Sequence, residues 1–464
     1  MTHFYDIPKV CYRGAGALTW LIVLAGSGIG VWRRADLYMA YQRAHVLMGT
    51  LAVLFALTLV QWVIAMFERP RRVSAKQEAL LNQLCVTVNI PVYNEDPLVL
   101  DRTLYALFTQ TRLPNRVQLV DDGSTTNYKE IRYYWEEHRP QSVQFSWVRQ
   151  RNQGKKRAQA RTFGHDDADI FVTLDSDTAL EPNALREGLK PFADRRVQSV
   201  AGVELAWNYR QNWLTRLNST RTLIWQMLSC SAQSVAGDVL VNRGTFALYR
   251  APVIKDNLRA YVHETFFGRP VDLGDDAALT LFARARGRAV QQPSAFQFAM
   301  YPDTLSHHIR QWTRWMRGST IRTFWRIRYL RVLTYSWWFT VINLWTYVVA
   351  LATVAVCAAF WPQSRLLAVT MTAASVVWSY LMAVRVFAIV RSDQSWGARL
   401  AGFAITPVVA FWSAFVLRPL RVYGIATCLH QKWVTRHTVE VGPHADERRI
   451  AARQEDRREE ETKV

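Results

Sequence analysis

The chain has no Cys-x-x-Cys pair, and its five cysteines are scattered over 464 residues without a histidine nearby at metal-ligand spacing. Disulfide frameworks and structural zinc sites both leave such spacing patterns in a sequence. We therefore expect neither of them, and we expect the thiols to be reduced and mostly buried.

Acidic residues are few relative to basic ones. The chain contains 37 Asp and Glu against 57 Lys and Arg, which gives a formal charge of +20. A charge of this size fits nucleic acid, anionic lipid or phosphorylated substrates as partners. The basic residues gather beside apolar segments and phosphate-type motifs, and no recognition helix or RNA-binding motif is recognisable. We predict no nucleic-acid partner and no obligatory protein partner.

The central part of the chain lacks any apolar run long enough to span a bilayer, whereas both flanks have them. A membrane-spanning helix needs about 20 apolar residues. Candidate runs precede the central part and follow it: Gly14–Trp32, Ala44–Phe67, Val332–Ser364, Leu366–Val384 and Leu400–Leu417. The first run could also belong to a signal peptide, but no cleavage site follows and a second run comes at once, so we interpret both as spans.

The length of the chain also favours two parts, since a single core stops growing at about 250–300 residues. We predict a membrane region with two spans at 1–80, a cytosolic domain at 81–302, an amphipathic interface helix at 303–331, a second membrane region at 332–430, and a charged tail at 431–464. The basic segment 68–76 favours a cytosolic central domain, although Arg33, Arg34 and Arg43 favour the opposite orientation. Because Pro407 interrupts the last apolar run, we expect that run to be broken or re-entrant.

Short β-rich segments alternate with helical patterns through the central part. Strands are predicted at 84–93, 117–122, 143–148, 169–175 and 197–205, with helices at 98–110, 128–137, 155–163 and 182–189 between them. This alternation predicts a mostly parallel sheet with helices on both faces. Ligands of such sheets bind at the carboxyl ends of the strands.

Acidic pairs lie where the predicted strands end. Asp121 and Asp122 follow one strand, and Asp175 and Asp177 follow another. Two carboxylates in a D-x-D pattern on an extended chain point to the same face, where they can share a divalent cation with a phosphate. Strand-end aspartates are also common turn formers, and for Asp121 and Asp122, taken by themselves, we favour this role over metal binding.

Two further segments carry candidate chemistry. Gly154 and Lys155 stand at a predicted helix start, a place where a phosphate can bind, although a basic helix start is often only solvated. Asp275 and Asp276 precede an alanine-rich helix, where one of them could serve as an N-cap.

The segment 309–322 combines Gln311, Arg314 and Trp315 within little more than one helical turn. Seven arginines and no acidic residue lie between Thr304 and Arg331. An indole packs on the apolar face of a sugar, and a guanidinium binds a diphosphate. An ordinary interfacial helix would share the composition, but it would not require this spacing.

The order of these motifs, PVYNED, DDGS, GKKRA, DSD, GDD and QWTRW, resembles that of the processive family 2 glycosyltransferases over roughly residues 84–330. The family includes hyaluronan, chitin and cellulose synthases and nodulation chitooligosaccharide synthases. The resemblance implies an α/β nucleotide-sugar-binding domain of the GT-A type, inserted between transmembrane helices of a multi-pass plasma-membrane protein. It also implies UDP-sugar donors, a growing polysaccharide as acceptor, membrane lipids as surroundings, and Mg²⁺ or Mn²⁺ as cofactor.

The same resemblance implies roles for single residues. Tyr93, Glu95 and Asp122 would hold the uridine, and Asp175 and Asp177 the metal. Asp276 would be the general base, with Asp275 and Lys155 beside the donor. Gln311 and Arg314 would contact the diphosphate, and Trp315 would lie under the terminal acceptor sugar.

Two segments bear on the subclass. Residues 430–437 contain Trp433 and Arg436 in a pattern similar to the Trp-Gly-Thr-Arg motif of hyaluronan synthases, with Val434 in place of the glycine, and Cys230 stands where those synthases have a cysteine near the acceptor. Against this, Ala277 occupies a position that is usually arginine in the hyaluronan group. We therefore expect a hyaluronan-like polymerase, with chitin-like synthesis from UDP-GlcNAc alone, or single-sugar transfer to a lipid phosphate, as alternatives.

Overall fold

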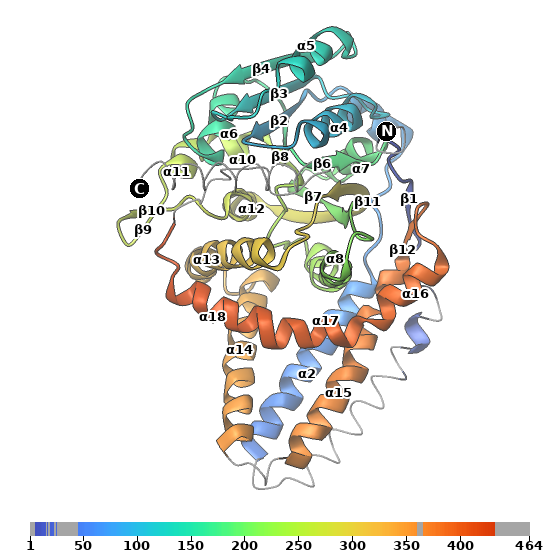
Figure 1. The fold of residues 1–464 in the computed structure, drawn as a ribbon, viewed down its shortest axis with the longest axis vertical. Helices are drawn as coiled ribbons and strands as arrows, with labels where there is room; N and C mark the ends of the chain where they lie inside the picture. Colours follow the sequence, from blue (N-terminus) through green and yellow to red (C-terminus); the bar gives the residue numbers. More distant parts are fainter. Residues whose placement is uncertain are drawn as a thin grey trace, which may run out of the picture.

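The computed structural model describes residues 5–14, 16, 19–22, 25, 45–359 and 365–431. An α/β domain forms one end of the molecule, and three long helices extend from it side by side (Figure 1). These helices are α2 (His45–Met66), α14 (Tyr335–Ala359) and α15 (Arg365–Ala383). Most of the first predicted span, together with Trp433, Arg436 and the charged tail, lies outside the described residues.

The α/β domain is built on an eight-stranded sheet with the order β4-β3-β2-β5-β8-β7-β11-β6. Its strands are β2 (Val86–Val92), β3 (Arg116–Asp121), β4 (Gln144–Arg149), β5 (Ile170–Leu174), β6 (Thr178–Leu180), β7 (Val197–Ala206), β8 (Phe246–Arg250) and β11 (Arg288–Ala299). The pairs β4-β3, β3-β2, β2-β5 and β7-β11 are parallel, whereas β8 and β6 pair antiparallel to their neighbours. The prediction of a mostly parallel sheet is confirmed.

Helices cover both faces of this sheet, as the alternating pattern predicted. They are α4 (Pro97–Phe108), α5 (Lys129–His138), α6 (Lys155–Phe163), α7 (Ala184–Leu189), α10 (Ala251–Lys255), α11 (Leu258–Val262) and α12 (Asp275–Arg286). Alternate residues of β5 point to opposite faces: Val172 packs in the core that includes α4 and α7, and Phe171 in the core that includes α6 and α10. A strand buried on both faces reads as a continuous apolar run, which is why β5 was predictable.

A helical segment absent from the predictions follows β7. It comprises α8 (Trp213–Trp225), a π-helical turn (Gln226–Cys230) and α9 (Ser231–Ala236). Asn212 caps α8 through a hydrogen bond from the backbone of Thr215. The hydrophobic residues of this segment show little helical periodicity, so the amphipathic pattern that reveals a helix is weak here.

The last described segment lies across the ends of the three long helices (Figure 1). It consists of α16 (Trp396–Ala404), α17 (Thr406–Trp412), a π-helical turn (Ser413–Leu417) and α18 (Arg418–Ala426). The helix is interrupted at Ile405, and Pro407 stands in the first turn of α17, where its missing N–H costs nothing. The break expected from Pro407 is therefore present.

Helix α13 (Leu305–Tyr329), which carries the Gln-x-x-Arg-Trp motif, is covered by α18. Gly424 permits close approach, because a Cβ there would lie 2.6 Å from the Cβ of Met316. Arg317 also donates a hydrogen bond to Thr427 at 3.0 Å. α13 also contacts α14 directly. That this helix lies at the membrane surface stays a prediction.

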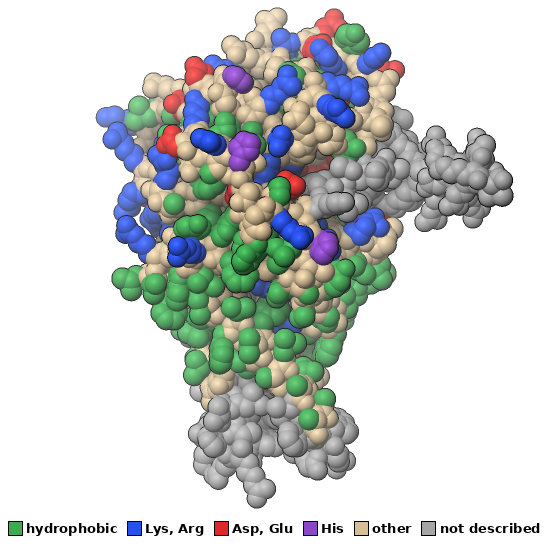
Figure 2. Space-filling model, turned by 90° about the vertical axis from the view of Figure 1, so that its left-hand side faces the viewer, with side chains coloured by type: hydrophobic (Ala, Val, Ile, Leu, Met, Phe, Trp, Pro, Cys, Tyr) green, Lys and Arg blue, Asp and Glu red, His purple; other side chains and the backbone are tan. Residues whose placement is uncertain are grey.

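Two described helical segments are long and apolar enough to cross a membrane, Tyr335–Ala355 and Thr406–Ala426. Shorter apolar helices cover Ala52–Met66 and Thr372–Ala388. Hydrophobic side chains gather on the half of the molecule formed by these helices, and charged ones on the α/β domain (Figure 2). Thr406–Ala426 lies across the long helices, so its direction differs from theirs although its composition is similarly apolar.

A buried ion pair joins the long helices to the α/β domain. Arg385, after α15, lies 3.3 Å from the carboxylate of Glu68, which follows α2, and both side chains are almost completely buried. Glu68 also accepts hydrogen bonds from Ser231 at 2.5 Å and from Gln291 at 3.0 Å. Arg385 donates a second bond to the carbonyl of Met227 at 2.6 Å. This network fixes the ends of α2 and α15 against the helical segment after β7 and against β11.

Candidate active site

The carboxyl ends of β2, β3 and β5 meet at one edge of the sheet, because the three strands are parallel neighbours. β3 ends with Asp121, and the turns that follow the three strands contain Tyr93 and Glu95, then Asp122, then Asp175. The topology therefore brings together motifs that are far apart in the sequence.

Asp122 is held by the loop that precedes α6. Its carboxylate accepts hydrogen bonds from the backbone N–H groups of Gln153 and Gly154, at 2.9 and 2.8 Å, and from the side chain of Gln150 at 2.8 Å. Gly154 has φ +88°, and Gly123 has φ +81° with the backbone nitrogen of Asn152 only 2.8 Å from where its Cβ would be. Both positions require glycine, since other residues rarely adopt such φ values.

Glu95 is buried in the turn after β2. Its backbone exchanges hydrogen bonds with the hydroxyl of Tyr128, and its carboxylate accepts one from Ser176 at 3.1 Å. Ser176 is the middle residue of the D-x-D motif, so Glu95 links the turn after β2 to the turn after β5. Tyr93 lies two residues before Glu95 and is partly buried.

Lys155, the first residue of α6, bridges two of the predicted acidic motifs. Its ammonium nitrogen lies 2.6 Å from a carboxylate oxygen of Asp175 and 3.1 Å from one of Asp275. Gly244 closes one side, because a Cβ there would lie 3.2 Å from that nitrogen. Burial opposes the charge of Lys155, but the two carboxylates outweigh it and raise its pKa.

From the spacing we predicted that the D-x-D motif lies on an extended chain. This prediction is wrong. β5 ends at Leu174, and Asp175–Asp177 form a turn into β6, closed by a hydrogen bond from the N–H of Thr178 to the carbonyl of Asp175. Asp175 pairs with Lys155, whereas Asp177 acts on the buried Arg102. Burial lowers the pKa of Arg102 to about 10, and Asp177 is the foremost charge that opposes this effect.

The adjacent aspartates at the start of α12 differ in their surroundings. Burial would raise the pKa of Asp275, but Lys155 outweighs it and lowers that pKa. Burial and then the charge of Asp275 raise the pKa of Asp276 to about 6. The N-cap position belongs to Gly274, with φ +74°, and α12 has no capping hydrogen bond from a side chain. The alternative that one aspartate is the N-cap is therefore wrong.

Helix α13 packs directly on the loop before these aspartates. A Cβ at Gly318 would lie 3.2 Å from the backbone nitrogen of Gly274, and Arg322 donates a hydrogen bond to the Gly274 carbonyl at 3.1 Å. Arg322 also forms a bidentate pair with Glu264, with both distances 2.8 Å, and Lys156 binds the same carboxylate. This buried network ties α13, α12 and α6 together.

Gln311, Arg314 and Trp315 lie on the part of α13 that precedes this contact. Trp315 is 46% exposed, and its ring lies edge-on to that of Trp312 with centroids 6.0 Å apart. Gln311 and Arg314 are partly buried. The indole of Trp315 therefore offers an accessible aromatic surface on the helix that packs on the loop before Asp275 and Asp276 (the acidic loop).

The two segments that bear on the subclass have different positions. Cys230 is buried at the end of the π-helical turn after α8, and burial raises the pKa of its thiol. Trp433 and Arg436 are not described, but Gln431 accepts a hydrogen bond from the backbone of Leu273 at 3.3 Å. The chain thus returns to the acidic loop two residues before Trp433.

The carboxylates at the sheet edge could hold a divalent cation. Asp175 and Asp177 are hard oxygen ligands, and Mg²⁺ in proteins often takes only one or two carboxylates, together with substrate phosphates. The ammonium of Lys155 lies between Asp175 and Asp275, which shows that this place stabilises positive charge. No group of three acidic, histidine or cysteine side chains among the described residues forms a complete metal site.

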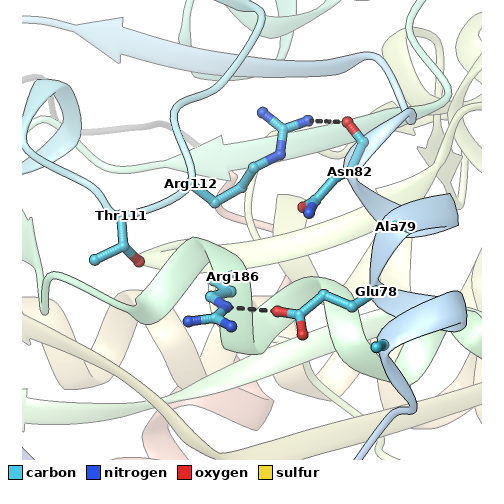
Figure 3. Close-up of a pocket in the computed structure, with 7 residues that line it drawn as sticks. Glu78, Ala79, Asn82, Thr111, Arg112 and Arg186 are labelled. Carbon is cyan, nitrogen blue, oxygen red and sulfur yellow. Dashed lines mark hydrogen bonds and ion pairs between the residues drawn. The ribbon is translucent and has the colours of Figure 1, made fainter.

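A pocket of about 420 Å³ lies elsewhere, between α3 (Ala75–Asn82) and α7 (Figure 3). Arg186 pairs there with Glu78 at 2.6 Å, and Arg112 donates to the carbonyl of Asn82 at 3.3 Å. These residues lie near the amino-terminal ends of β2 and β3, opposite the acidic motifs. The pocket therefore has no part in the chemistry of the sheet edge.

Sequence reasoning missed Gly244, Glu264, Arg322 and Arg102. Glu264 and Arg322 lie 58 positions apart, and no spacing rule relates them. Arg322 was visible only as one of the arginines of a basic helix. Gly244 follows Arg243 in a loop without any motif, so only its contact with Lys155 reveals it.

Comparison with known proteins agrees with this geometry. Residues 83–318 match the family described as "Glycosyltransferase like family 2". A hyaluronan synthase from Streptococcus pyogenes is 32% identical over 362 residues, covering 77% of this chain and 84% of that protein. An N-acetylglucosaminyltransferase from Rhizobium sp. (strain N33) is 28% identical over 398 residues, covering 83% and 85%.

A solved structure has the same fold. It is a mannosyltransferase from Pyrobaculum calidifontis in complex with GDP-Man and Mn²⁺, with a TM-score of 0.53 and 20% identity, covering 74% of this chain and 96% of that one. At this identity the likeness concerns the fold alone.

Proposed function

The chain belongs to glycosyltransferase family 2, and from this premise we propose that it is a processive inverting transferase that polymerises UDP-sugars into a β-linked polysaccharide. The donors are UDP-GlcNAc and UDP-GlcA, and the product is a hyaluronan-like polymer that leaves through the membrane. The observation that carries the proposal is the contact between α13 and the acidic loop, through Gly318 and Gly274. It supports the proposal because Trp315 lies on the helix that packs on the loop before Asp275 and Asp276.

The proposed donor site lies at the sheet edge. Tyr93, Glu95 and Asp122 bind the uridine, and Lys155, Gln311 and Arg314 bind the diphosphate. Asp175 and Asp177 hold Mg²⁺ or Mn²⁺, which supplies charge neutralisation at the leaving diphosphate when it is bound. The mannosyltransferase with the same fold was solved with a nucleotide-sugar and Mn²⁺, which supports this class of donor and cofactor.

The proposed chemistry is a single displacement. The acceptor hydroxyl attacks the anomeric carbon, the bond to UDP breaks, and Asp276 takes the hydroxyl proton. The raised pKa of Asp276 favours it as the proton acceptor, whereas Asp275 is stabilised as an anion by Lys155. Trp315 orients the terminal acceptor sugar, since a misplacement of about 1 Å can cost ~100-fold in rate.

We propose that α2, α14 and α15 cross the membrane and that α16–α18 lie at its cytosolic face. Gln431, after α18, contacts the catalytic domain at Leu273. The chain end therefore lies on the same side as that domain if α14 and α15 each cross once. A cysteine introduced at Val464 should resist labelling by an impermeant reagent in intact cells, and labelling there would contradict this topology.

The donor set is tested with membranes that contain the protein. Supplied with UDP-GlcNAc, UDP-GlcA and Mn²⁺, they should form a long polymer that hyaluronan lyase degrades, and chelation of the metal should stop synthesis. A polymer formed from UDP-GlcNAc alone and degraded by chitinase would favour the chitin-like alternative, which the relative from Rhizobium keeps open. Transfer of one sugar to a lipid phosphate would contradict processive synthesis.

A further inference from the structure

A second group of charged residues lies beside the site, between α8 and α13. Arg243 pairs with Glu204 at 2.9 Å and lies over the ring of Trp225, 4.8 Å from its centroid. Arg221 lies over the ring of Trp312 at 4.5 Å. None of these residues has a role in the proposed chemistry described above.

The carboxylate of Glu204 is fully engaged by neighbours other than Arg221. It binds Arg243, and it accepts hydrogen bonds from Tyr301 at 2.7 Å and from Thr245 at 2.9 Å. Among the described residues, Glu204 forms its ion pair with Arg243, and it is the one carboxylate that acts on both guanidinium groups.

Arg221 is the residue with the surplus charge. Its Nε–H is buried and has no hydrogen-bond partner within the described part of the chain. His308, on the adjacent helix, adds no charge at neutral pH, because burial and then Arg221 lower its pKa to about 4. The group of Arg221, Arg243 and Glu204 thus carries one net positive charge. Keeping such a charge away from water is costly unless a partner compensates it.

The group is next to residues of the proposed donor and acceptor sites. Arg243 precedes Gly244, which closes the side of Lys155 and Asp175, and Trp312 is in edge contact with Trp315. The Nε–H of Arg221 is buried, whereas the residue as a whole is partly exposed. α8 and α13 both lie between the sheet and the segment formed by α17 and α18, on the part of the α/β domain that is turned toward the long helices (Figure 1).

We infer that Arg221 determines specificity by binding the carboxylate of a uronic acid unit in the acceptor strand. One surplus positive charge matches one carboxylate per disaccharide of an alternating polymer. The planar guanidinium, already oriented on Trp312, suits a carboxylate better than a neutral sugar hydroxyl. The inference rests on the proposed function and assigns to Arg221 the recognition of the anionic unit of its product.

The test measures binding of two oligosaccharides of equal length to the full-length protein in detergent. One contains alternating glucuronic acid, and the other is a neutral chitooligosaccharide. The wild type should prefer the anionic one, and Arg221→Gln should weaken its binding about 10-fold or more, the scale of a charged hydrogen bond. Binding of the chitooligosaccharide and of UDP should not change. Arg221→Lys should restore part of the preference.

Arg216→Gln is the matched control, because Arg216 is exposed on the same helix. It should leave all three affinities unchanged. The melting temperature should separate a binding role from a structural one: removal of a buried charge without a counter-ion should leave it unchanged or raise it.

Several outcomes would overturn the inference. These are equal binding of the two oligosaccharides by the wild type, an equal loss for both in Arg221→Gln, or a loss of UDP affinity, which would assign Arg221 to the diphosphate. They differ from failure of the proposed function, in which the wild type itself would neither bind UDP nor form polymer from any UDP-sugar.

Discussion

The backbone nitrogen of Gly274 lies 3.2 Å from the position that a Cβ of Gly318 would occupy. Through this contact, the helix with the Gln-x-x-Arg-Trp motif rests directly on the loop that leads into Asp275 and Asp276. The helix that carries the proposed acceptor surface and the loop before the proposed base therefore share one tight contact, which would have to widen slightly to admit a methyl group.

Gly318→Ala should separate these two parts of the site. The loop or α13 would have to move by a few tenths of an ångström to admit the methyl group. Since a displacement of about 1 Å can lower the rate ~100-fold, this smaller shift should still slow synthesis. The cost in stability should be about 1–3 kcal/mol, as for other overpacked sites. Polymer synthesis should fall much more than UDP binding. Gly402→Ala in α16 is the control, since a Cβ there would make only an ordinary contact, 3.7 Å from Thr220. Normal synthesis by Gly318→Ala would show that the contact is not needed.

Asp276→Asn should nearly abolish polymer synthesis. The amide cannot take the proton of the acceptor hydroxyl, and loss of a general base typically costs ~10²–10⁴-fold. Binding of UDP with Mn²⁺ should persist, because the metal is assigned to Asp175 and Asp177, and Asp177→Asn should weaken that binding. Synthesis by Asp276→Asn at a near-normal rate, or a loss confined to UDP affinity, would refute the assignment.

The rate should also depend on pH through Asp276. Its pKa is raised to about 6, and a base must be deprotonated to act, so kcat/KM should rise as the pH increases through about 6 and then level off. The measurement is initial polymer synthesis from pH 5 to pH 8. A rate that stays constant down to pH 5 would contradict the prediction.

Trp315→Ala should remove the surface on which the acceptor sugar packs. The contact itself is worth about 1 kcal/mol, but loss of orientation should lower the rate by ~100-fold. Trp315→Phe should restore part of the activity, and UDP binding should remain. Because Trp315 is 46% exposed, the variant should fold normally, and thermal unfolding provides the check. Unchanged turnover in Trp315→Ala would disprove the role of the motif.

Glu68→Gln should destabilise the junction between the long helices and the α/β domain. It leaves Arg385 buried without its counter-charge, which typically costs about 3–5 kcal/mol. Combining it with Arg385→Met should recover part of the loss. The exposed pair Arg132–Glu136 is the control, and Glu136→Gln should change the stability by only about 0.5 kcal/mol. Equal melting temperatures for both single variants would contradict the prediction.

Much of the α/β domain was determined by local sequence. β5 is a nearly continuous apolar run, and β2 alternates apolar residues with Thr87 and Asn89. α6 was predicted with the bounds that the structure has, because Gly154 precedes a basic helix of good propensity. β11 was missed, since its register shifts between Gln291 and Phe296 and its apolar alternation is interrupted. β8 was also missed. It is short, and no local sequence pattern indicates that it pairs antiparallel with β5.

The motifs and their order could be recognised from the sequence by itself, because each motif is defined by a few residue types at short spacing. Only the tertiary structure decided how they meet. Lys155 bridges Asp175 and Asp275 because α6 and α12 start at the same edge of the sheet, and the D-x-D motif is a turn because β5 is followed at once by β6. The tertiary structure also decides that Glu204 forms its ion pair with Arg243, whereas Arg221 lies over the ring of Trp312. No local pattern in the sequence distinguishes these two arginines.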